Sequence, residues 1–169
     1  ITLLAASGGL QAGWRSGLMS IYREVLCSLR PRFLGRALLC GVSAFLSRPR
    51  ALSLPMRVEI ENGAGCNFKC GMCALNHMKR KRGFLDYEKF KAVYDQVRPP
   101  YLNLTGYTES FLNRDIFQMI QYGKKGGSFI KIDSNASVMD QEVCRKIVDS
   151  GLDAISISVD GSDADAYAR

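Results

Sequence analysis

R-V-E-I-E-N-G-A-G-C-N-F-K-C-G-M-C, residues 57–73, joins a short alternating segment to a loop that carries three cysteines. Residues 57–61 alternate between apolar and charged side chains, which predicts a β-strand. Cys66, Cys70 and Cys73 follow in a C-x3-C-x2-C pattern. The stretch therefore predicts a strand whose carboxyl end leads into a loop with three thiols.

The same order of strand, loop and helix repeats along the rest of the chain. The pattern predicts strands at 57–61, 101–105, 128–133 and 154–159, and helices at 87–97, from 113 or 115 to 122, at 140–150 and from 163. Such alternation favours parallel βαβ units, which build either an open doubly wound sheet or a barrel. In both folds ligands bind beyond the carboxyl ends of the strands, so we expect the four following loops to converge on one mouth.

The three cysteines have two chemical interpretations. Three thiolates can hold three irons of a [4Fe–4S] cluster and leave the fourth iron open, whereas ordinary ferredoxin sequences supply a fourth cysteine. His77, the only histidine, lies four residues after Cys73, so a Cys3His zinc site is the alternative. Zinc ligands usually come as two separated pairs. Cys144, on a predicted helix, is expected in the core. The predicted mouth at the strand ends favours an iron–sulfur enzyme.

The N-terminal third of the chain has its own composition. Residues 1–57 contain eight arginines, no lysine and one acidic residue, so the whole net charge of +7 lies there. Apolar residues at helical spacing over 14–47 predict two helices separated at Pro31. We expect a helical hairpin that packs on the following domain. A helix on an acidic membrane surface and a targeting segment are the alternatives. The segment lacks the aromatic interleaving that favours nucleic acid.

Length and ends bound the interpretation. No apolar run of the 169 residues reaches the length of a membrane span. The chain begins at Ile1 rather than Met and stops at Arg169, within what looks like the first turn of a helix. We therefore expect a piece of a longer protein, whose last strand would expose an edge. The sequence shows no signal peptide, so we expect free thiols rather than a disulfide framework. The expected compartment is a reducing one, the cytoplasm.

The motifs together resemble the radical S-adenosylmethionine (SAM) superfamily. C-N-F-K-C-G-M-C after a strand resembles the cluster loop of that family. Three further segments follow in the family's order: 104–113 (L-T-G-Y-T-E-S-F-L-N) resembles G-x-G-E-P, 133–136 (D-S-N-A) resembles T-N-G/A, and 156–161 (S-I-S-V-D-G) with Tyr167 and Arg169 resembles S-x-D-G…Y…R. Thr108 and Ser110 depart from the glycine and proline of the second segment. The details resemble the branch that often carries a C-terminal SPASM domain.

The resemblance implies a fold and cofactors. The fold would be an incomplete parallel (β/α)6-type partial barrel over residues 56–169, with four of its strands present, preceded by a basic helical extension over 1–55. Cys66, Cys70 and Cys73 would hold a [4Fe–4S] cluster, and its open iron would bind SAM. One electron, from a donor such as flavodoxin or ferredoxin, would then release a 5′-deoxyadenosyl radical that abstracts hydrogen from an unknown substrate, a peptide or a small molecule.

The resemblance also implies contacts with SAM. These fall on six residues: Met72, Thr108, Glu109, Ser134, Asn135 and Ser158. Each has a structural alternative, such as packing for Met72, a helix cap for Glu109, a turn for Asn135 or a strand end for Ser158. The segment 79–82 (K-R-K-R) is expected to be a solvated loop, with an acidic substrate as the alternative. The alternative for the whole chain is a non-catalytic iron–sulfur or zinc-binding module.

Overall fold

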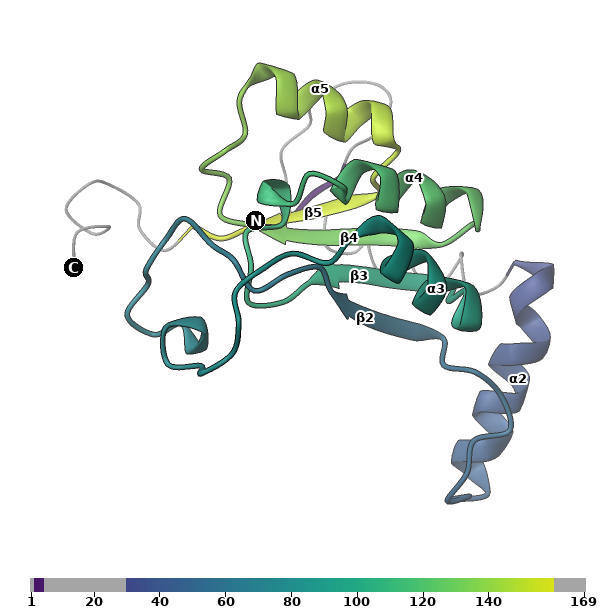
Figure 1. The fold of residues 1–169 in the computed structure, drawn as a ribbon. Helices are drawn as coiled ribbons and strands as arrows, with labels where there is room; N and C mark the ends of the chain where they lie inside the picture. The colour runs from purple at the N-terminus through teal and green to yellow at the C-terminus, as the bar shows by residue number, and fades with distance from the viewer. Residues whose placement is uncertain (1, 5–29, 160–169) are drawn as a thin grey trace.

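The structure is a computed structural model that describes residues 2–4 and 30–159 (Figure 1). Its strands are β1 (Thr2–Leu4), β2 (Arg57–Glu61), β3 (Tyr101–Thr105), β4 (Phe129–Ser134) and β5 (Ala154–Ile157). Its α-helices are α2 (Pro31–Phe45), α3 (Tyr87–Val97), α4 (Ile116–Lys125) and α5 (Gln141–Ser150), and its 3₁₀ turns are η1 (Ala74–Asn76) and η2 (Ser110–Leu112).

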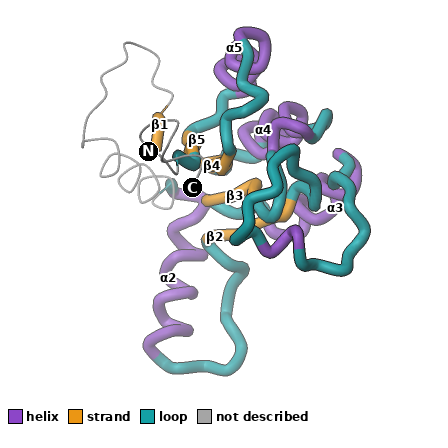
Figure 2. Tube along the Cα trace, turned by 90° about the vertical axis from the view of Figure 1, so that its left-hand side faces the viewer, coloured by secondary structure: helices purple, strands orange, loops and turns teal. Residues whose placement is uncertain are grey.

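The sheet has the order expected of a barrel segment. β2, β3, β4 and β5 are parallel, and each pairs with the next strand along the chain, in the sheet order β1-β5-β4-β3-β2. Helices α3, α4 and α5 all cover one face of this sheet, as the end-on view of Figure 2 shows. A doubly wound sheet would reverse its strand order and place helices on both faces. The α/β partial barrel predicted from the sequence is therefore confirmed.

Local signals set most boundaries where the sequence predicted them. The carboxylates of Asp86 and Asp140 accept hydrogen bonds from the third residue of α3 and α5, and thereby cap both helices. Gly151 ends α5 at a φ of 76°, which glycine adopts without strain. The differences are small: β4 lies one residue later than predicted, β5 stops at Ile157, and α4 begins after Asp115. The helix predicted from residue 163 lies outside the described residues.

Strand β1 is the largest departure from the sequence interpretation. Residues 1–55 were expected to be helical, yet Thr2–Leu4 pairs antiparallel with Ala154–Ser156 of β5. The expectation that the last strand exposes its edge is therefore wrong, because β1 satisfies backbone groups on that side. Pairing between segments 150 residues apart leaves no local pattern in a three-residue strand.

The two faces of the sheet differ in chemistry. On the helix side, Leu102, Leu104, Ile130 and Ile132 are fully buried and pack against α3, α4 and α5. On the other side, Tyr101 stacks on Phe129 near the amino ends of the strands, with ring centroids 5.4 Å apart. The helices are therefore held by apolar burial, which is the largest favourable term in folding.

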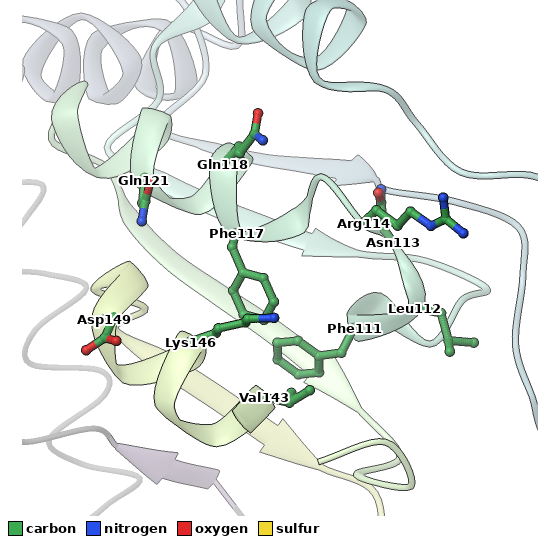
Figure 3. Close-up of a pocket in the computed structure, with 10 residues that line it drawn as sticks. All are labelled: Phe111, Leu112, Asn113, Arg114, Phe117, Gln118, Gln121, Val143, Lys146 and Asp149. Carbon is green, nitrogen blue, oxygen red and sulfur yellow. The ribbon is translucent and has the colours of Figure 1, made fainter. Parts of the chain in front are cut away.

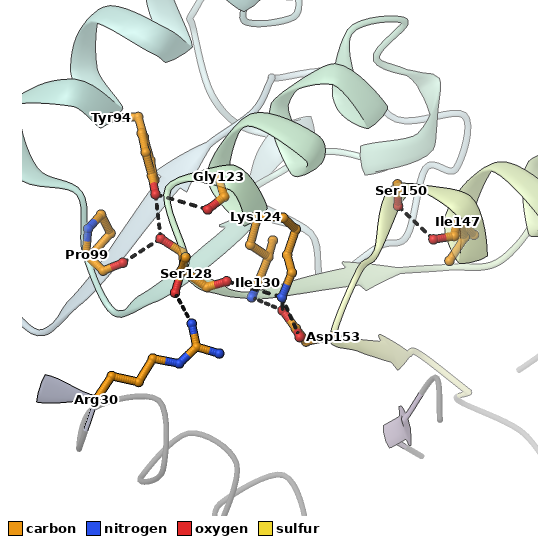
Figure 4. A network of polar contacts seen from close by, with 11 residues as sticks. Arg30, Tyr94, Pro99, Gly123, Lys124, Ser128, Ile130, Ile147, Ser150 and Asp153 are labelled. Atoms are coloured by element: carbon orange, nitrogen blue, oxygen red, sulfur yellow. Dashed lines mark hydrogen bonds and ion pairs between the residues drawn. The ribbon is translucent and has the colours of Figure 1, made fainter. Parts of the chain in front are cut away.

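Polar contacts secure the amino-end side of the sheet (Figure 4). The Tyr94 hydroxyl lies 2.7 Å from the Ser128 hydroxyl and donates to the Gly123 carbonyl at 3.1 Å. Lys124 pairs with Asp153, whose carboxylate also accepts from the Ile130 backbone N–H at 2.8 Å. These contacts join α3 and α4 to β4 and to the start of β5, far from the cysteine loop.

Helix α2 stands apart from the sheet, at the end opposite the cysteine loop (Figure 1). It begins at Pro31, as the sequence predicted, and Arg36 ties it to the carbonyls of Val97 and Arg98 at the end of α3. Leu38 and Phe45 are 68% and 88% exposed. The helix predicted before Pro31 lies mostly outside the described residues. Within the described part of the chain, no helix has the length and apolar character needed to span a membrane.

Candidate functional site

The three cysteines lie on a loop, residues 62–85, whose two ends are pinned together beyond the carboxyl end of β2. The Ala64 N–H donates to the Gly83 carbonyl at 2.7 Å, and the Leu85 N–H donates to the Asn62 carbonyl at 3.0 Å. A Cβ atom on Gly63 would lie 2.6 Å from the Phe84 ring, so only glycine lets the two arms approach this closely. Backbone hydrogen bonds therefore hold the first and last residues of the loop together, next to the end of β2.

The loop after β3 holds this loop from the side. The Gly65 carbonyl, next to the first cysteine, accepts hydrogen bonds from the Thr108 hydroxyl at 2.8 Å and from the Glu109 N–H at 2.9 Å. Thr108 stands where the family pattern has its second glycine. Its side chain here fixes the position of the backbone that carries Cys66.

Glu109 connects the loop after β3 to the loop after β4. Glu109 is 1% exposed, and its carboxylate accepts from the Ser134 hydroxyl and the Asn135 N–H, both at 2.8 Å, and from the Phe111 N–H at 3.3 Å. Buried carboxylates need such donors, because an unpaired buried charge is very costly. In this structure the Glu109 oxygens are thus occupied by the chain itself, and a contact with the amino group of SAM stays a prediction.

Asn135 brings the loop after β4 to the first cysteine. Its side-chain N–H group lies 3.7 Å from the Cys66 sulfur and 3.2 Å from the Asn67 side-chain oxygen. Asn67 in turn donates to the Ser137 hydroxyl at 2.7 Å, and the Phe68 N–H lies 3.4 Å from the same sulfur. Donors placed around a metal-binding side chain fix its orientation. The sequence reasoning missed Asn67, which lies inside the cysteine motif, and Ser137, which directly follows the segment 133–136.

The cysteines themselves form no disulfide. Cys66 and Cys73 are partly buried and Cys70 is exposed, with the Cys73 N–H donating to the Cys70 carbonyl at 3.0 Å. Among the described residues, no three His, Cys, Asp or Glu side chains already lie close enough together to hold a metal ion. Three free thiols on one pinned loop, with N–H donors at Cys66, nonetheless supply the donor set that an iron–sulfur cluster takes from cysteine.

The remaining predicted contacts divide into two groups. Ser134 is buried beside Glu109, so it joins Thr108, Glu109 and Asn135 around Cys66. Met72 is 93% exposed at the tip of the loop, and Ser158 is exposed just past β5, where its N–H donates to the Ser134 carbonyl. The structure therefore assembles four of the six residues near the first cysteine. Ser158 joins them only through its backbone contact with Ser134, and Met72 makes no hydrogen bond with them.

The segment 79–82 is only partly a solvated loop. Arg80 binds the Glu61 carboxylate through both terminal nitrogens, and the Tyr107 N–H donates to the same carboxylate at 3.1 Å. The Arg80 hydrogen bond is the main reason that the pKa of Glu61 lies below its ordinary value; burial opposes this shift, and the Tyr107 N–H adds to it. The φ of Gly106 is 134°, and a Cβ there would collide with the Glu61 side chain.

A groove of about 550 Å³ lies elsewhere, on the helix side (Figure 3). It is formed by η2, α4 and α5 and mixes the rings of Phe111 and Phe117 with Lys146 and Asp149. None of the predicted site residues lines it. We therefore assign it no part in the chemistry of the cysteine loop.

We predict that Glu109→Gln destabilises the fold by about 1–3 kcal/mol, since the new amide nitrogen would meet a backbone N–H or a hydroxyl that now donates to a carboxylate. Urea unfolding followed by circular dichroism measures this. Glu142→Gln is the matched control, because Glu142 pairs with Lys146 only on the exposed surface of α5. Equal unfolding midpoints for both variants would contradict the role of Glu109 as a tie between loops.

We predict that the Glu61–Arg80 pair makes the stability of the fold depend on pH in the acid range. Because folding lowers the pKa of Glu61, the pair contributes fully above the ordinary value of 4.5, and its contribution is lost as the pH falls through the lowered pKa. As the pH is lowered from neutral, the free energy of unfolding should therefore fall less steeply for Glu61→Gln than for the unchanged chain. Glu88→Gln, an exposed position on α3, should keep the original slope.

The comparison with protein families gives a match over residues 60–169, to the model described as the radical SAM superfamily. This range contains the three cysteines, all six predicted SAM contacts and strands β3, β4 and β5. It covers more than half of the chain.

Several curated proteins are similar to the same part of the chain. The AdoMet-dependent heme synthase of Methanosarcina barkeri is 27% identical over 67% of this chain and 33% of the relative. The cofactor-modifying protein for tungsten-containing aldehyde ferredoxin oxidoreductase of Pyrococcus furiosus is 26% identical over 60% and 30%. Mycofactocin maturase MftC of Mycolicibacterium smegmatis is 25% identical over 69% and 30%. The chain thus spans about a third of the length of these relatives.

A solved structure supports the fold. BtrN, crystallised with AdoMet and 2-DOIA, superposes with a TM-score of 0.52 over 59% of this chain and 44% of its own, at 18% identity. At that identity the likeness concerns the fold alone. The [4Fe–4S] cluster and SAM are the cofactors of the matched family, which is a family of enzymes. From the family match, the cysteine loop and the parallel sheet together, we conclude that this chain belongs to the radical SAM superfamily.

Proposed function

We propose that this chain supplies the cluster loop and part of the SAM site of an enzyme that generates a 5′-deoxyadenosyl radical. The observation that supports this most directly is the hydrogen-bonded network around Cys66. Loops that follow three different strands, β2, β3 and β4, meet there through Gly65, Thr108, Glu109 and Asn135. A parallel sheet places ligands at this end of its strands.

The residues have separate tasks in this proposal. Cys66, Cys70 and Cys73 hold the cluster, and Asn135 and the Phe68 N–H stabilise negative charge on the first sulfur. Glu109 and Ser134 keep the loops in register, and Thr108 fixes Gly65. Once bound, the reduced cluster and SAM supply a radical that abstracts hydrogen from a C–H bond, while the protein provides position and excludes water.

The organisation of the whole protein is part of the same proposal. Residues 56–169 form part of the catalytic domain and 1–55 form a basic extension, and the enzyme belongs to the branch that often carries a C-terminal SPASM domain. The substrate is a peptide or a small molecule, and the electron donor is a carrier such as flavodoxin or ferredoxin. A reducing compartment, the cytoplasm, suits the free thiols of the loop.

We predict that alanine at Cys66, Cys70 or Cys73 abolishes cluster assembly, because each thiolate holds one iron and each substitution leaves a second iron without a protein ligand. Iron and acid-labile sulfide would be measured after anaerobic reconstitution, with 5′-deoxyadenosine as the second readout. Cys144 is exposed on α5, so its predicted place in the core is wrong, and Cys144→Ala serves as the control that should assemble normally. Bound zinc in place of iron, lost in His77→Ala, would contradict the proposal and indicate a Cys3His site.

A second proposal concerns helix α2. Its exposed apolar residues include Leu38 and Phe45, and Arg48 and Arg50 follow its end. No acidic residue occurs between Glu24 and Glu59. Apolar side chains flanked by arginines are typical of helices that lie on an anionic membrane surface.

We predict that the chain binds vesicles that contain phosphatidylserine more strongly than neutral phosphatidylcholine vesicles, and that salt weakens this binding. Leu38→Glu with Phe45→Glu should remove it. Val148→Glu, which changes an exposed apolar residue on α5, is the matched control. Sedimentation with vesicles measures both, and equal binding of neutral and anionic vesicles would contradict the electrostatic part of the proposal.

A further inference from the structure

The side of the sheet away from helices α3, α4 and α5, which we call the inner face, is polar towards the carboxyl ends of the strands (Figure 2). Val58, Ile60, Leu102 and Leu104 point to the helices, so the residues between them point to the inner face. Strand pairing places three of these side chains in one row, namely Glu59, Asn103 and Lys131. Barrel interiors are filled mainly by bulky apolar side chains. This polar row therefore calls for another explanation than packing.

Most charges of the inner face already have a partner. The Lys131 ammonium lies 2.7 Å from the Asp133 carboxylate, and the Glu61 carboxylate is bound by Arg80. The guanidinium of Arg57 lies over an aromatic ring of β3, 4.7 Å from the ring centroid. These side chains therefore satisfy one another within the fold.

Glu59 and Asn103 are the exceptions. Glu59 is exposed and has no ion pair or hydrogen bond within the part of the chain that the structure describes. Asn103, directly opposite in the strand register, is 4% exposed, and its side-chain oxygen is buried without a hydrogen-bond partner. Two oxygen acceptors thus lie side by side on neighbouring strands, and no described residue donates to either.

A comparison with Asn62 shows that Asn103 is not explained by the fold. The Asn62 side-chain oxygen is also buried without a partner, but its N–H₂ group donates to the Leu104 carbonyl at 3.1 Å and to the Ser110 hydroxyl at 3.0 Å. Asn62 therefore holds the base of the cysteine loop. The Asn103 side chain makes no such bond among the described residues, and a buried polar group without a partner is costly.

We propose that Glu59 and Asn103 bind a protonated nitrogen of the substrate, an ammonium or a guanidinium group. The proposal rests on the proposed function and narrows its substrate to a cationic one. A cationic nitrogen supplies several N–H donors, and its hydrogen bonds to a carboxylate are charge-assisted. Such a ligand would satisfy the buried Asn103 oxygen and neutralise Glu59 at the same time.

The depth of the pair suits an anchor rather than the reacting atom. Glu59 and Asn103 lie two residues before the strand ends at Glu61 and Thr105, which is roughly 7 Å along a strand. A substrate held there by its nitrogen would extend towards the cysteine loop beyond those ends. Binding energy from a part of the substrate that does not react can orient the C–H bond that does.

The binding test uses four small probes that share a butyl chain. They are n-butylammonium, butylguanidinium, neutral n-butanol and anionic butyrate. Each is titrated at low salt into the isotope-labelled, reconstituted chain, and two-dimensional amide NMR spectra report the shifts of Glu59 and Asn103. We expect both cations to shift these signals and n-butanol to bind about tenfold more weakly or less. The tighter of the two cations identifies the nitrogen group.

Variants assign the binding to the two residues. Glu59→Gln and Asn103→Leu should each weaken cation binding about tenfold, whereas Glu88→Gln, at an exposed position on α3, should not change it. Binding of n-butanol as tight as that of the cations would overturn the proposal. So would tighter binding of butyrate, which would assign the inner face to anions through Lys131.

Unfolding by urea separates a ligand-binding role of Asn103 from a structural one. Asn103→Leu should leave the midpoint unchanged or raise it, because the variant removes a buried acceptor that lacks a partner. Asn62→Leu is the matched comparison and should lower the midpoint, because it removes two hydrogen bonds. An equal fall for both variants would mean that Asn103 serves the fold, and would overturn its role here.

Failure of this site and failure of the proposed function give different results. Iron content and the response of the reduced cluster to SAM are measured on the same samples. If the cluster assembles and responds to SAM while the cations leave Glu59 and Asn103 unshifted, the proposed function stands and the cation site is wrong. If no cluster assembles, the proposed function fails, and the assignment of a substrate to this pair fails with it.

Discussion

The Gly65 carbonyl is the contact on which the candidate site depends. It accepts one hydrogen bond from the Thr108 hydroxyl and one from the Glu109 backbone, and the next residue is the first cysteine. Those two donors come from the loop after β3, which is anchored in turn to the loop after β4 through the Glu109 carboxylate. One carbonyl oxygen thus connects the thiol loop to two neighbouring strands, and the sheet sets the position of Cys66.

This constraint explains an unusual feature of the sequence. The family pattern has glycine where this chain has Thr108, and a glycine could make no side-chain bond to Gly65. The threonine hydroxyl adds a donor of ordinary strength, about 0.5–1.5 kcal/mol for a typical hydrogen bond. Glycine is kept nearby at Gly63, where a side chain would strike the Phe84 ring. Gly63 therefore provides the close backbone approach, and Thr108 provides the side-chain hydrogen bond, at two positions of the same network.

The sequence predicted what local patterns determine. Asp86, Asp140 and Gly151 set the ends of α3 and α5 through backbone chemistry that acts within a few residues. The strands and helices of this part of the chain were predicted almost to the residue. Contacts between distant segments were not predictable in this way. Thr2–Leu4 pairs with β5, and the partners of Glu109 are Ser134 and Asn135, some 25 residues further along. The resemblance to the family's motif singled out Glu109, while its burial under two loops required the fold.

The two ends of the sheet differ in chemical character. The carboxyl ends carry the thiols, the hydrogen-bonded loops and exposed lysines, whereas the amino ends carry the network of Tyr94, Lys124 and Asp153 and the projecting helix α2 (Figures 1 and 4). A parallel sheet produces this division, because all its strands point the same way. The two proposals, radical chemistry at the cysteine loop and membrane binding by helix α2, therefore use different surfaces of the molecule.

The central claim is that the pinned loop holds a cluster with one iron open to SAM. Low-temperature EPR of the anaerobically reconstituted and reduced chain, recorded with and without SAM, tests it most directly. The account predicts a reduced [4Fe–4S] signal whose shape changes when SAM is added. A reduced cluster signal that SAM leaves unchanged would contradict the claim, since it would describe a module that only transfers electrons.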